Sequence, residues 1–488
     1  MFRLLKRQSI SSSLAAVMTM TVAQRVLSVV RQVVFTRMLG PANLGALGLA
    51  VDTIVGTPLN FVTLGLPSSY TRYVQQYERK GRLRDFFFRT IRLSLGLAVL
   101  AALACMALAP QLSSLVFRGR EHVWLVVVAA LIIVPESMQR HVRAGFAGMR
   151  MFFVTSAMDF FPVLVFTVVG VAFVLLIARN AVAAAAAQAT GSWLTLAVFG
   201  GLLWRHLKSV EPVRQRIDEP DFTFKILKFS SWYILVPVEM QVLLLVDRWM
   251  LVRMRGLHDV GIYTAASSVS AYVFLLGALT ANVLGPNLSQ MWEEGDRELV
   301  MRRINLALRV TLLALLGVAL FLLGVSPWVI PLMCGKAFAQ SASLMWAFGV
   351  YHLFYSAFYV LGLYPMLVER PHMNLIAVSV ALAVDVPLNL LLIPRYGVYG
   401  AAVAGFTSMG TIVLVLLLQC LRAGLKVQPR TYLVLVLQLL PTLRSRRLLL
   451  AVYAALVLVV VLTPWVLTRE EKALLTGQAT AFLRRRRL

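Results

Sequence analysis

The chain has 488 residues, of which 59% are hydrophobic and 14% are charged, and its formal net charge is +26. This composition is too apolar for a soluble protein, whose surface must be largely polar. The positive residues stand in short loops between long apolar runs, as the positive-inside rule requires, so the charge does not indicate nucleic-acid binding. We therefore expect an all-α polytopic membrane protein.

Twelve apolar segments follow one another, each near the length that crosses a hydrocarbon core of roughly 30 Å. The first begins like a signal peptide but runs on past Arg25, so we expect it to be retained as a helix. Two further segments near the carboxyl end leave the total at twelve, thirteen or fourteen. The twelve are expected at residues 10–35, 44–66, 90–109, 123–140, 155–178, 181–204, 229–252, 262–284, 304–325, 341–367, 373–393 and 398–420.

Lysine and arginine are more than twice as frequent in the loops on the side of the amino terminus as in the loops on the other side. The amino terminus is therefore expected to be cytoplasmic. The three cysteines are widely separated along the chain, which indicates neither a disulfide framework nor a metal site.

The two halves of the chain look like copies of one unit. RMLGPANLGALGLA from Arg37 aligns with RMRGLHDVGIYTAA from Arg253, which pairs Gly45 with Gly261 at an offset of 216 residues. Loops of unrelated membrane proteins also resemble one another, but the constant offset favours duplication. It predicts two pseudo-symmetric six-helix lobes: residues 1–204, a cytoplasmic linker at 205–228, residues 229–420, and an extension at 421–488 with one or two membrane segments and a basic tail.

Three motifs resemble signatures of bacterial polysaccharide-export flippases of the O-antigen type: the stretch from Arg37, LVDRWMLVRMRGLHDVGIYTAA from Leu245, and NLLLIPRYGVYGAA from Asn389. Such flippases belong to the multidrug/oligosaccharidyl-lipid/polysaccharide exporter superfamily, together with lipid II flippases and multidrug extruders. The resemblance covers about residues 10 to 425. It implies alternating access between the lobes, which moves a polyprenyl-diphosphate-linked oligosaccharide across the cytoplasmic membrane of a bacterium.

Ionisable side chains within the predicted spans are the candidate functional residues, because each costs about 2.5 to 3.5 kcal/mol unless it has a partner or an aqueous cavity. Guanidinium groups stay protonated and match phosphate oxygens. Instead of binding a substrate, Arg25 could form a structural ion pair with Asp52. Arg140 and Arg143 could likewise serve only to anchor the protein at the membrane surface. We expect the cavity for the substrate diphosphate to include Arg25, Arg31, Asp52, Arg140, Arg143 and Arg248.

A second group combines carboxylate and neutral oxygens. Counting along the spans places Glu239, Asp385 and Thr407 at one depth, and Asn389 lies one helical turn from Asp385. Such a group suits Na⁺ or a transferable proton, although hydrogen bonds that only pack helices are an alternative. It is similar to the sodium site of lipid II flippases on spans seven, eleven and twelve, except that this chain has Glu239 where that site uses aspartate.

The sequence holds no Walker-type phosphate loop. We expect a transporter with no catalytic residue and no cofactor. Transport could be coupled to Na⁺ or H⁺, and no other metal ion is expected. A multidrug/cation antiporter is the nearer rival function and a membrane glycosyltransferase or polymerase the more distant one. The expected partners are the lipid-linked oligosaccharide, membrane lipids and other export proteins such as a polymerase, with the protein itself a monomer.

Overall fold

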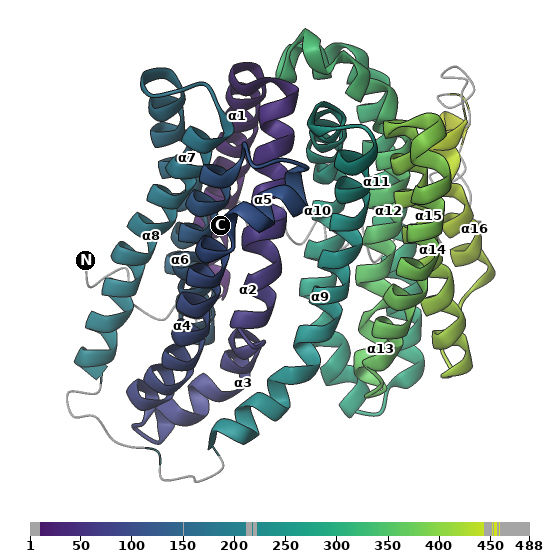
Figure 1. Ribbon diagram of the computed structural model, residues 1–488. Coiled ribbons are helices and arrows are strands. Elements are labelled where there is room, and N and C mark those ends of the chain that lie inside the picture. The colour runs from purple at the N-terminus through teal and green to yellow at the C-terminus, as the bar shows by residue number, and fades with distance from the viewer. Residues whose placement is uncertain are drawn as a thin grey trace. The chain divides into compact units, whose positions relative to one another are not determined.

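The computed structural model describes residues 10–149, 151–210, 217, 222–443, 451, 453–455 and 458 (Figure 1). These residues are almost entirely helical and include no β-strand, which confirms the all-α prediction. The described residues leave out 211–216 and 218–221 of the predicted linker at 205–228. They also leave out almost all of the extension after residue 443. The lobe boundaries therefore stay a prediction.

The first six predicted spans fall on helices of the amino-terminal half. The π-helix η2 and the short helix α2 continue α1. The short helix α3 precedes the membrane-length helix α4, and α5 follows it. In chain order the elements are α1 (Ile10–Ala50), η2 (Val51–Gly56), α2 (Thr57–Val62), α3 (Leu66–Arg79), α4 (Leu83–Ala107), α5 (Ala109–Phe117), α6 (Val123–Gly148), α7 (Phe152–Leu176) and α8 (Ala181–Val210).

The last six predicted spans also fall on helices. A 3₁₀ segment, η3, leads into α12, and a second one, η4, follows α16. The elements are α9 (Phe222–Met254), α10 (Leu257–Glu293), α11 (Arg297–Cys334), η3 (Lys336–Leu344), α12 (Met345–Leu361), α13 (Leu363–Leu367), α14 (His372–Tyr396), α15 (Val398–Arg422), α16 (Pro429–Leu437) and η4 (Leu440–Thr442).

Nine helical segments in the described part of the chain are long and apolar enough to cross a membrane, by length and composition. The first of them, Ala23–Val62, covers most of the second predicted span, at 44–66, and the end of the first, at 10–35, which the sequence separated by a loop. The structure replaces that loop with a kink at Gly40, whose φ of 72° and ψ of 174° are accessible to glycine. Pro41 follows and supplies no backbone N–H, so the helical hydrogen bonds are interrupted there.

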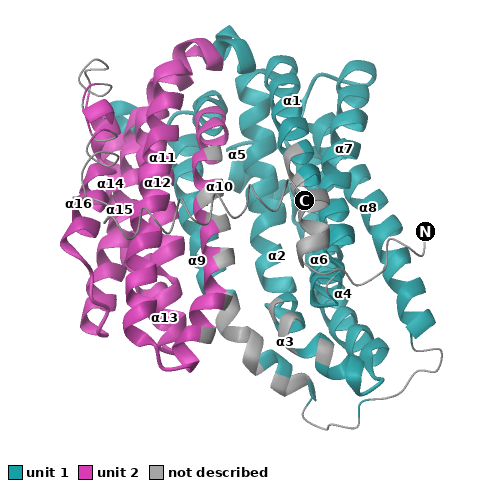
Figure 2. Cartoon of the chain, turned by 180° about the vertical axis from the view of Figure 1, so that it is seen from behind, with its two compact units in different colours: residues 1–264, 331–338, 393–398 teal, residues 265–330, 339–392, 399–488 magenta. Residues whose placement is uncertain are grey.

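The contacts divide the chain into two compact units, coloured separately in Figure 2. Unit 1 comprises Met1–Thr264, Pro331–Phe338 and Ile393–Val398, and unit 2 comprises the remainder. From the carboxyl-terminal half, unit 1 thus takes in α9, the start of α10 up to Thr264, and two short segments at the ends of α11 and α14. Its core is rich in buried aromatic side chains, among them Tyr70, Tyr77, Phe86, Phe87 and Phe146.

Candidate substrate and coupling sites

Asp52 lies on the π-helix η2 and forms an ion pair with Arg248 of α9, not with Arg25. The π-turn comes just before Pro58, which cannot donate a backbone hydrogen bond. The backbone carbonyl of Asp52 accepts a hydrogen bond from Gln241 Nε2 at 3.0 Å and one from Thr57 Oγ1 at 3.4 Å. Two predicted cavity residues, Asp52 and Arg248, are therefore brought together, and their charges neutralise each other.

Two arginines of α6 have different partners. The Arg143 guanidinium binds both carboxylate oxygens of Asp159 on α7, at 2.6 and 2.9 Å. Such a two-pronged pair is geometrically specific. Arg140 instead donates to the amide oxygen of Asn60 on α2 at 3.3 Å. Arg143 is thus neutralised by a carboxylate within hydrogen-bond distance, whereas the side-chain partner of Arg140 is neutral.

The two predicted arginines of α1 also differ. The Arg31 guanidinium lies over the Phe166 ring of α7, 4.9 Å from the ring centroid, which is a cation–π contact. Arg25 is exposed and makes no hydrogen bond or ion pair with another described residue. It stands within Ala23–Val62, a segment with the length and hydropathy of a membrane span.

Asp385 of α14 is fully buried in unit 2. Asn389 Nδ2 donates to one of its carboxylate oxygens at 2.9 Å, and Ser408 Oγ of α15 donates to the other at 2.6 Å. Thr407, the predicted neighbour, donates to the Val403 carbonyl of its own helix at 2.8 Å. The structure therefore joins Asp385 with Asn389 and Ser408 by hydrogen bonds, and Thr407 is not part of this group.

Glu239 lies on α9 in unit 1 and is half-buried. The four predicted coupling residues are thus divided between the units, with Glu239 in one and Asp385, Asn389 and Thr407 in the other. Within the described residues, no group of three or more histidine, cysteine, aspartate or glutamate side chains is placed to hold a metal ion.

The ionisable residues within predicted spans that were not among the predicted site residues include Glu136 and Arg309. Glu136 of α6 accepts a hydrogen bond from Ser192 Oγ at 3.3 Å. Arg309 of α11 is fully buried, and its Nε donates to the Asn305 carbonyl at 3.3 Å. Both residues could have been found by listing every charged residue of spans 123–140 and 304–325.

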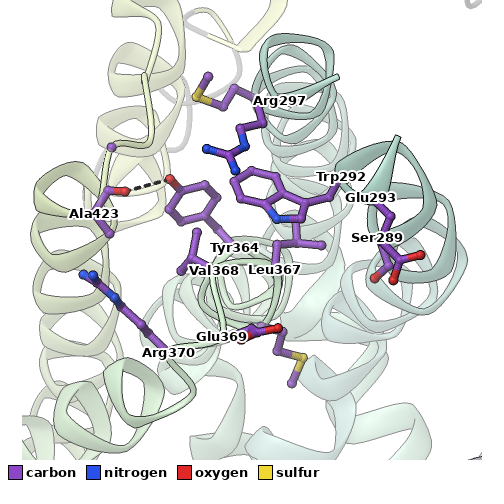
Figure 3. A pocket seen from close by; sticks show the side chains of 13 residues that line it. Ser289, Trp292, Glu293, Arg297, Tyr364, Leu367, Val368, Glu369, Arg370 and Ala423 are labelled. Carbon is purple, nitrogen blue, oxygen red and sulfur yellow. Dashed lines mark hydrogen bonds between the residues drawn. The ribbon is translucent and has the colours of Figure 1, made fainter. Parts of the chain in front are cut away.

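A pocket of about 580 Å³ in unit 2 lies where α10, α11, α13 and α15 end or begin (Figure 3). Its wall includes Trp292, whose ring lies under the Arg297 guanidinium at 5.1 Å, and Tyr364, whose hydroxyl donates to the Ala423 carbonyl at 3.0 Å. None of the predicted site residues lines it. This pocket is therefore separate from the predicted substrate and coupling residues.

A set of contacts in unit 1 repeats with the offset of 216 residues. Arg37 donates to the carbonyl of Leu332 in the last turn of α11, and Arg253 donates to the carbonyl of Leu115 in the last turn of α5. Leu332 minus 216 is position 116, next to Leu115. Both arginines thereby satisfy carbonyl groups that a helix end leaves without a partner.

The two aligned glycines show the same reciprocity. A Cβ at Gly45 would meet the Leu257 carbonyl oxygen, and a Cβ at Gly261 would meet the Pro41 carbonyl oxygen. Positions 41 and 257 again differ by 216. Glycine is required at both positions because α1 and α10 approach each other with backbone against backbone.

The comparisons with known proteins agree with this architecture. A family model described as polysaccharide biosynthesis protein matches residues 11–292. No curated protein sequence matches the chain. The fold is similar to that of the lipid II flippase MurJ in an inward closed conformation, with a TM-score of 0.72 and 14% identity over 91% of this chain and 99% of that chain.

Two other structures of similar fold are transporters of the MOP superfamily. One is an inward-facing multidrug resistance MATE transporter, with a TM-score of 0.64 and 14% identity over 82% of this chain and 94% of that chain. The other, from Pyrococcus furiosus, is described as having a binding pocket of reverse polarity, with a TM-score of 0.59 and 16% identity over 87% and 98% of the two chains. At such identities the likeness shows the fold alone.

Proposed function

The chain belongs to the family of polysaccharide biosynthesis proteins, and from this premise we propose that it is a flippase for a polyprenyl-diphosphate-linked oligosaccharide. It moves this substrate across the bacterial cytoplasmic membrane by alternating access, for the export of a cell-surface polysaccharide. Its amino terminus is cytoplasmic. The protein is a transporter, so the chemistry of glycan synthesis and polymerisation belongs to partner proteins of the export pathway.

Arg25 is the observation on which this proposal depends. Its exposed guanidinium stands in a membrane-length segment and binds no other described residue. A charge in that position costs about 2.5 to 3.5 kcal/mol unless water or an anion accompanies it. The diphosphate of a lipid-linked glycan is such an anion, and a guanidinium group matches its oxygens.

The remaining predicted arginines divide by their partners. Arg143 and Arg248 are each paired with an aspartate, so they hold helices together. Arg140 donates a hydrogen bond to the neutral amide of Asn60, and Glu136 lies one helical turn away on α6. We assign Arg140 a second contact to the diphosphate, after Arg25.

The contacts of unit 1 support alternating access. In the predicted topology the turn from Arg253 to Gly261 and the segments Pro331–Phe338 and Ile393–Val398 are external, and all three pack in unit 1 with the amino-terminal helices. The reciprocal arginine and glycine contacts lie in the first two of these segments or beside them. We infer a state closed toward the outside and a duplicated architecture.

The test is export of surface polysaccharide in cells that lack their own flippase and produce the full-length protein. We expect Arg25→Ala to abolish export and to leave lipid-linked oligosaccharide in the inner leaflet, while Arg25→Lys retains part of the activity. Arg120→Ala is the matched control, because Arg120 is an exposed loop arginine. Full export by Arg25→Ala at normal protein levels would contradict the proposal.

A multidrug/cation antiporter is the second candidate, because aromatic side chains gather in unit 2. The Tyr355 and Phe274 rings stack with centroids 4.3 Å apart, and Tyr359 meets both rings edge-on at 5.3 and 5.0 Å. Aromatic faces attract organic cations. Efflux of ethidium that is lost in Tyr355→Ala but kept in Arg25→Ala would favour this function over the flippase.

A further inference from the structure

Three fully buried polar atoms of α4 and α6 in unit 1 have no hydrogen-bond partner among the described residues. They are Ser94 Oγ of α4, Ser137 Oγ of α6 and His141 Nε2 of α6. Leaving a buried polar group without a partner is unfavourable, so such groups in proteins nearly always bind another polar group or an ordered water. Three of them on two neighbouring helices point to a shared ligand.

The packing of α4 against α6 shows which of their residues lie opposite each other. A Cβ on Gly145 of α6 would lie 2.6 Å from the Phe87 ring of α4. One turn further, the Tyr70 hydroxyl of α3 bridges the two helices, since it lies 2.7 Å from Thr90 Oγ1 and 2.9 Å from His141 Nδ1. Residue numbers thus rise along α4 as they fall along α6, so the two helices are antiparallel.

Ser94 and Ser137 occupy the next turn of this interface. Ser94 follows Thr90 by four residues and Ser137 precedes His141 by four, so each lies on the same helix face as the residue that Tyr70 contacts. Both lie eleven residues, or about 16 Å, from the helix end on the predicted cytoplasmic side, which is near the middle of a hydrocarbon core of roughly 30 Å. The two hydroxyls therefore face each other at one depth.

His141 completes the group. Side chains of an α-helix lean toward its amino-terminal end, so the His141 ring leans toward Ser137. Its Nδ1 is bonded to the Tyr70 hydroxyl, which leaves Nε2 as the third atom beside the two serine hydroxyls.

The charged residues next to this group bind elsewhere. Glu136 precedes Ser137 and accepts a hydrogen bond from α8, and Arg140 precedes His141 and donates one to α2. A bound ion would need a compensating charge in this apolar interior. The ligand is therefore neutral, and it can both donate and accept, because a serine hydroxyl does either.

We propose that one ordered water molecule binds between α4 and α6, to Ser94 Oγ, Ser137 Oγ and His141 Nε2. Buried waters typically make about three hydrogen bonds to groups that are otherwise unsatisfied, which matches the atoms available. One turn away the Tyr70 hydroxyl fills the corresponding gap between Thr90 and His141, so a group of that size fits between the helices. The site contains no residue that we assign to the substrate, so it stands independently of the proposed function.

A double-mutant cycle tests the shared water by thermal unfolding of the full-length protein in detergent. We expect Ser94→Ala and Ser137→Ala each to lower the unfolding temperature by about 2 °C or more. The double variant should lower it by clearly less than the two shifts together, because both substitutions release the same water. The helix propensity of alanine cancels in this comparison.

The matched control uses Thr195 of α8, which is equally buried in unit 1. Its hydroxyl donates to the Gly191 carbonyl of its own helix at 2.7 Å, so it shares no ligand with Ser94. The shifts of Thr195→Val and Ser94→Ala should therefore add. His141→Asn keeps a polar atom near the place of Nδ1 and removes Nε2, so its shift should couple to that of Ser137→Ala.

Two results would overturn the proposal. One is additive shifts for Ser94→Ala and Ser137→Ala, or a rise in unfolding temperature for both, since either would show that the hydroxyls share no ligand. The other is an experimental structure that shows ordered waters elsewhere but no density within hydrogen-bond distance of both serine hydroxyls. Density at that place, contacting His141 Nε2 as well, would establish the site without any variant.

Discussion

At the scale of single residues, the arginines of the membrane segments differ in what neutralises them. Arg143 and Arg248 contact aspartates, Arg31 lies over an aromatic ring, and Arg25 has no described partner. The sequence identified all four as candidates, Arg25, Arg31 and Arg248 because they lie within predicted spans and Arg143 because it follows the cytoplasmic end of one. It could not separate them, because a partner is set by the rotation of one helix against another, and hydropathy carries no information on that rotation.

Variants of Asp385 and Thr407 can test whether the direction of a side chain, and not only its depth in the membrane, determines its contribution to stability. Asp385→Ala removes the buried carboxylate that accepts from Asn389 Nδ2 and Ser408 Oγ, which should cost about 1 to 3 kcal/mol of stability, although Ser408 can still donate to the Ala404 carbonyl. Thr407→Val removes only a bond to its own helix and should have little effect. The measurement is thermal unfolding in detergent for both variants.

The coupling role of Asp385 needs a separate readout. Asp385→Asn keeps the shape of the side chain and removes its charge, so we expect it to fold and to lose the dependence of transport on a Na⁺ or H⁺ gradient. Gradient-independent transport by wild type, together with full activity in Asp385→Asn, would leave this cluster with a packing role only.

At the scale of elements, the twelve predicted spans all fall on helices, because long apolar runs determine them directly. The kink at Gly40 and the π-turn at Val51–Gly56 were not predicted. Neither changes the hydropathy of the segment, so span-length reasoning placed a loop where the helix continues. Thr407 was predicted to lie near Asp385, but the contact is made by its neighbour Ser408. Adjacent residues share a depth in the membrane but point about 100° apart around a helix, so depth alone could not distinguish the two.

The approach of α1 to α10 gives a prediction at this scale. Gly261→Ala places a Cβ against the backbone carbonyl of Pro41, which no side-chain rotation can relieve, so it should destabilise the protein by about 1 to 3 kcal/mol or more. Gly201→Ala in α8 is the matched control, because nothing lies within 4 Å of a Cβ there. That substitution should be neutral or stabilising by about 0.5 to 1 kcal/mol. Thermal unfolding of the two variants checks the contrast.

At the scale of the whole molecule, the motif from Arg37 and its counterpart from Arg253 led to the polysaccharide biosynthesis family, which the family match confirms, and to a fold similar to that of a lipid II flippase. These motifs contain the glycines and arginines of the reciprocal contacts, so they report architecture. We instead assign substrate choice to Arg25, which has no described partner and lies in none of these motifs.

Opening toward the outside should expose Cys334, which is buried beside Arg37 and Leu332. In a Cys105→Ser/Cys420→Ser background, we expect Arg37→Ala to increase labelling of Cys334 by a membrane-impermeant maleimide added outside the cell. Arg395→Ala, at an exposed arginine also predicted to be external, is the control. Unchanged labelling in Arg37→Ala would show that the Leu332 carbonyl contact does not hold the external side closed.

The π-turn in η2 has one further consequence. A π-turn carries one residue more than an α-turn, so its loss would change the register of the helix by one residue and rotate one flank about 100° against the other. Asp52 sits within that turn, and Gln241 of α9 holds its carbonyl. A shift of the π-turn along the helix would rotate the Asp52 carboxylate away from Arg248 without unfolding the span. The membrane segment could then change its register by one residue while it stays helical.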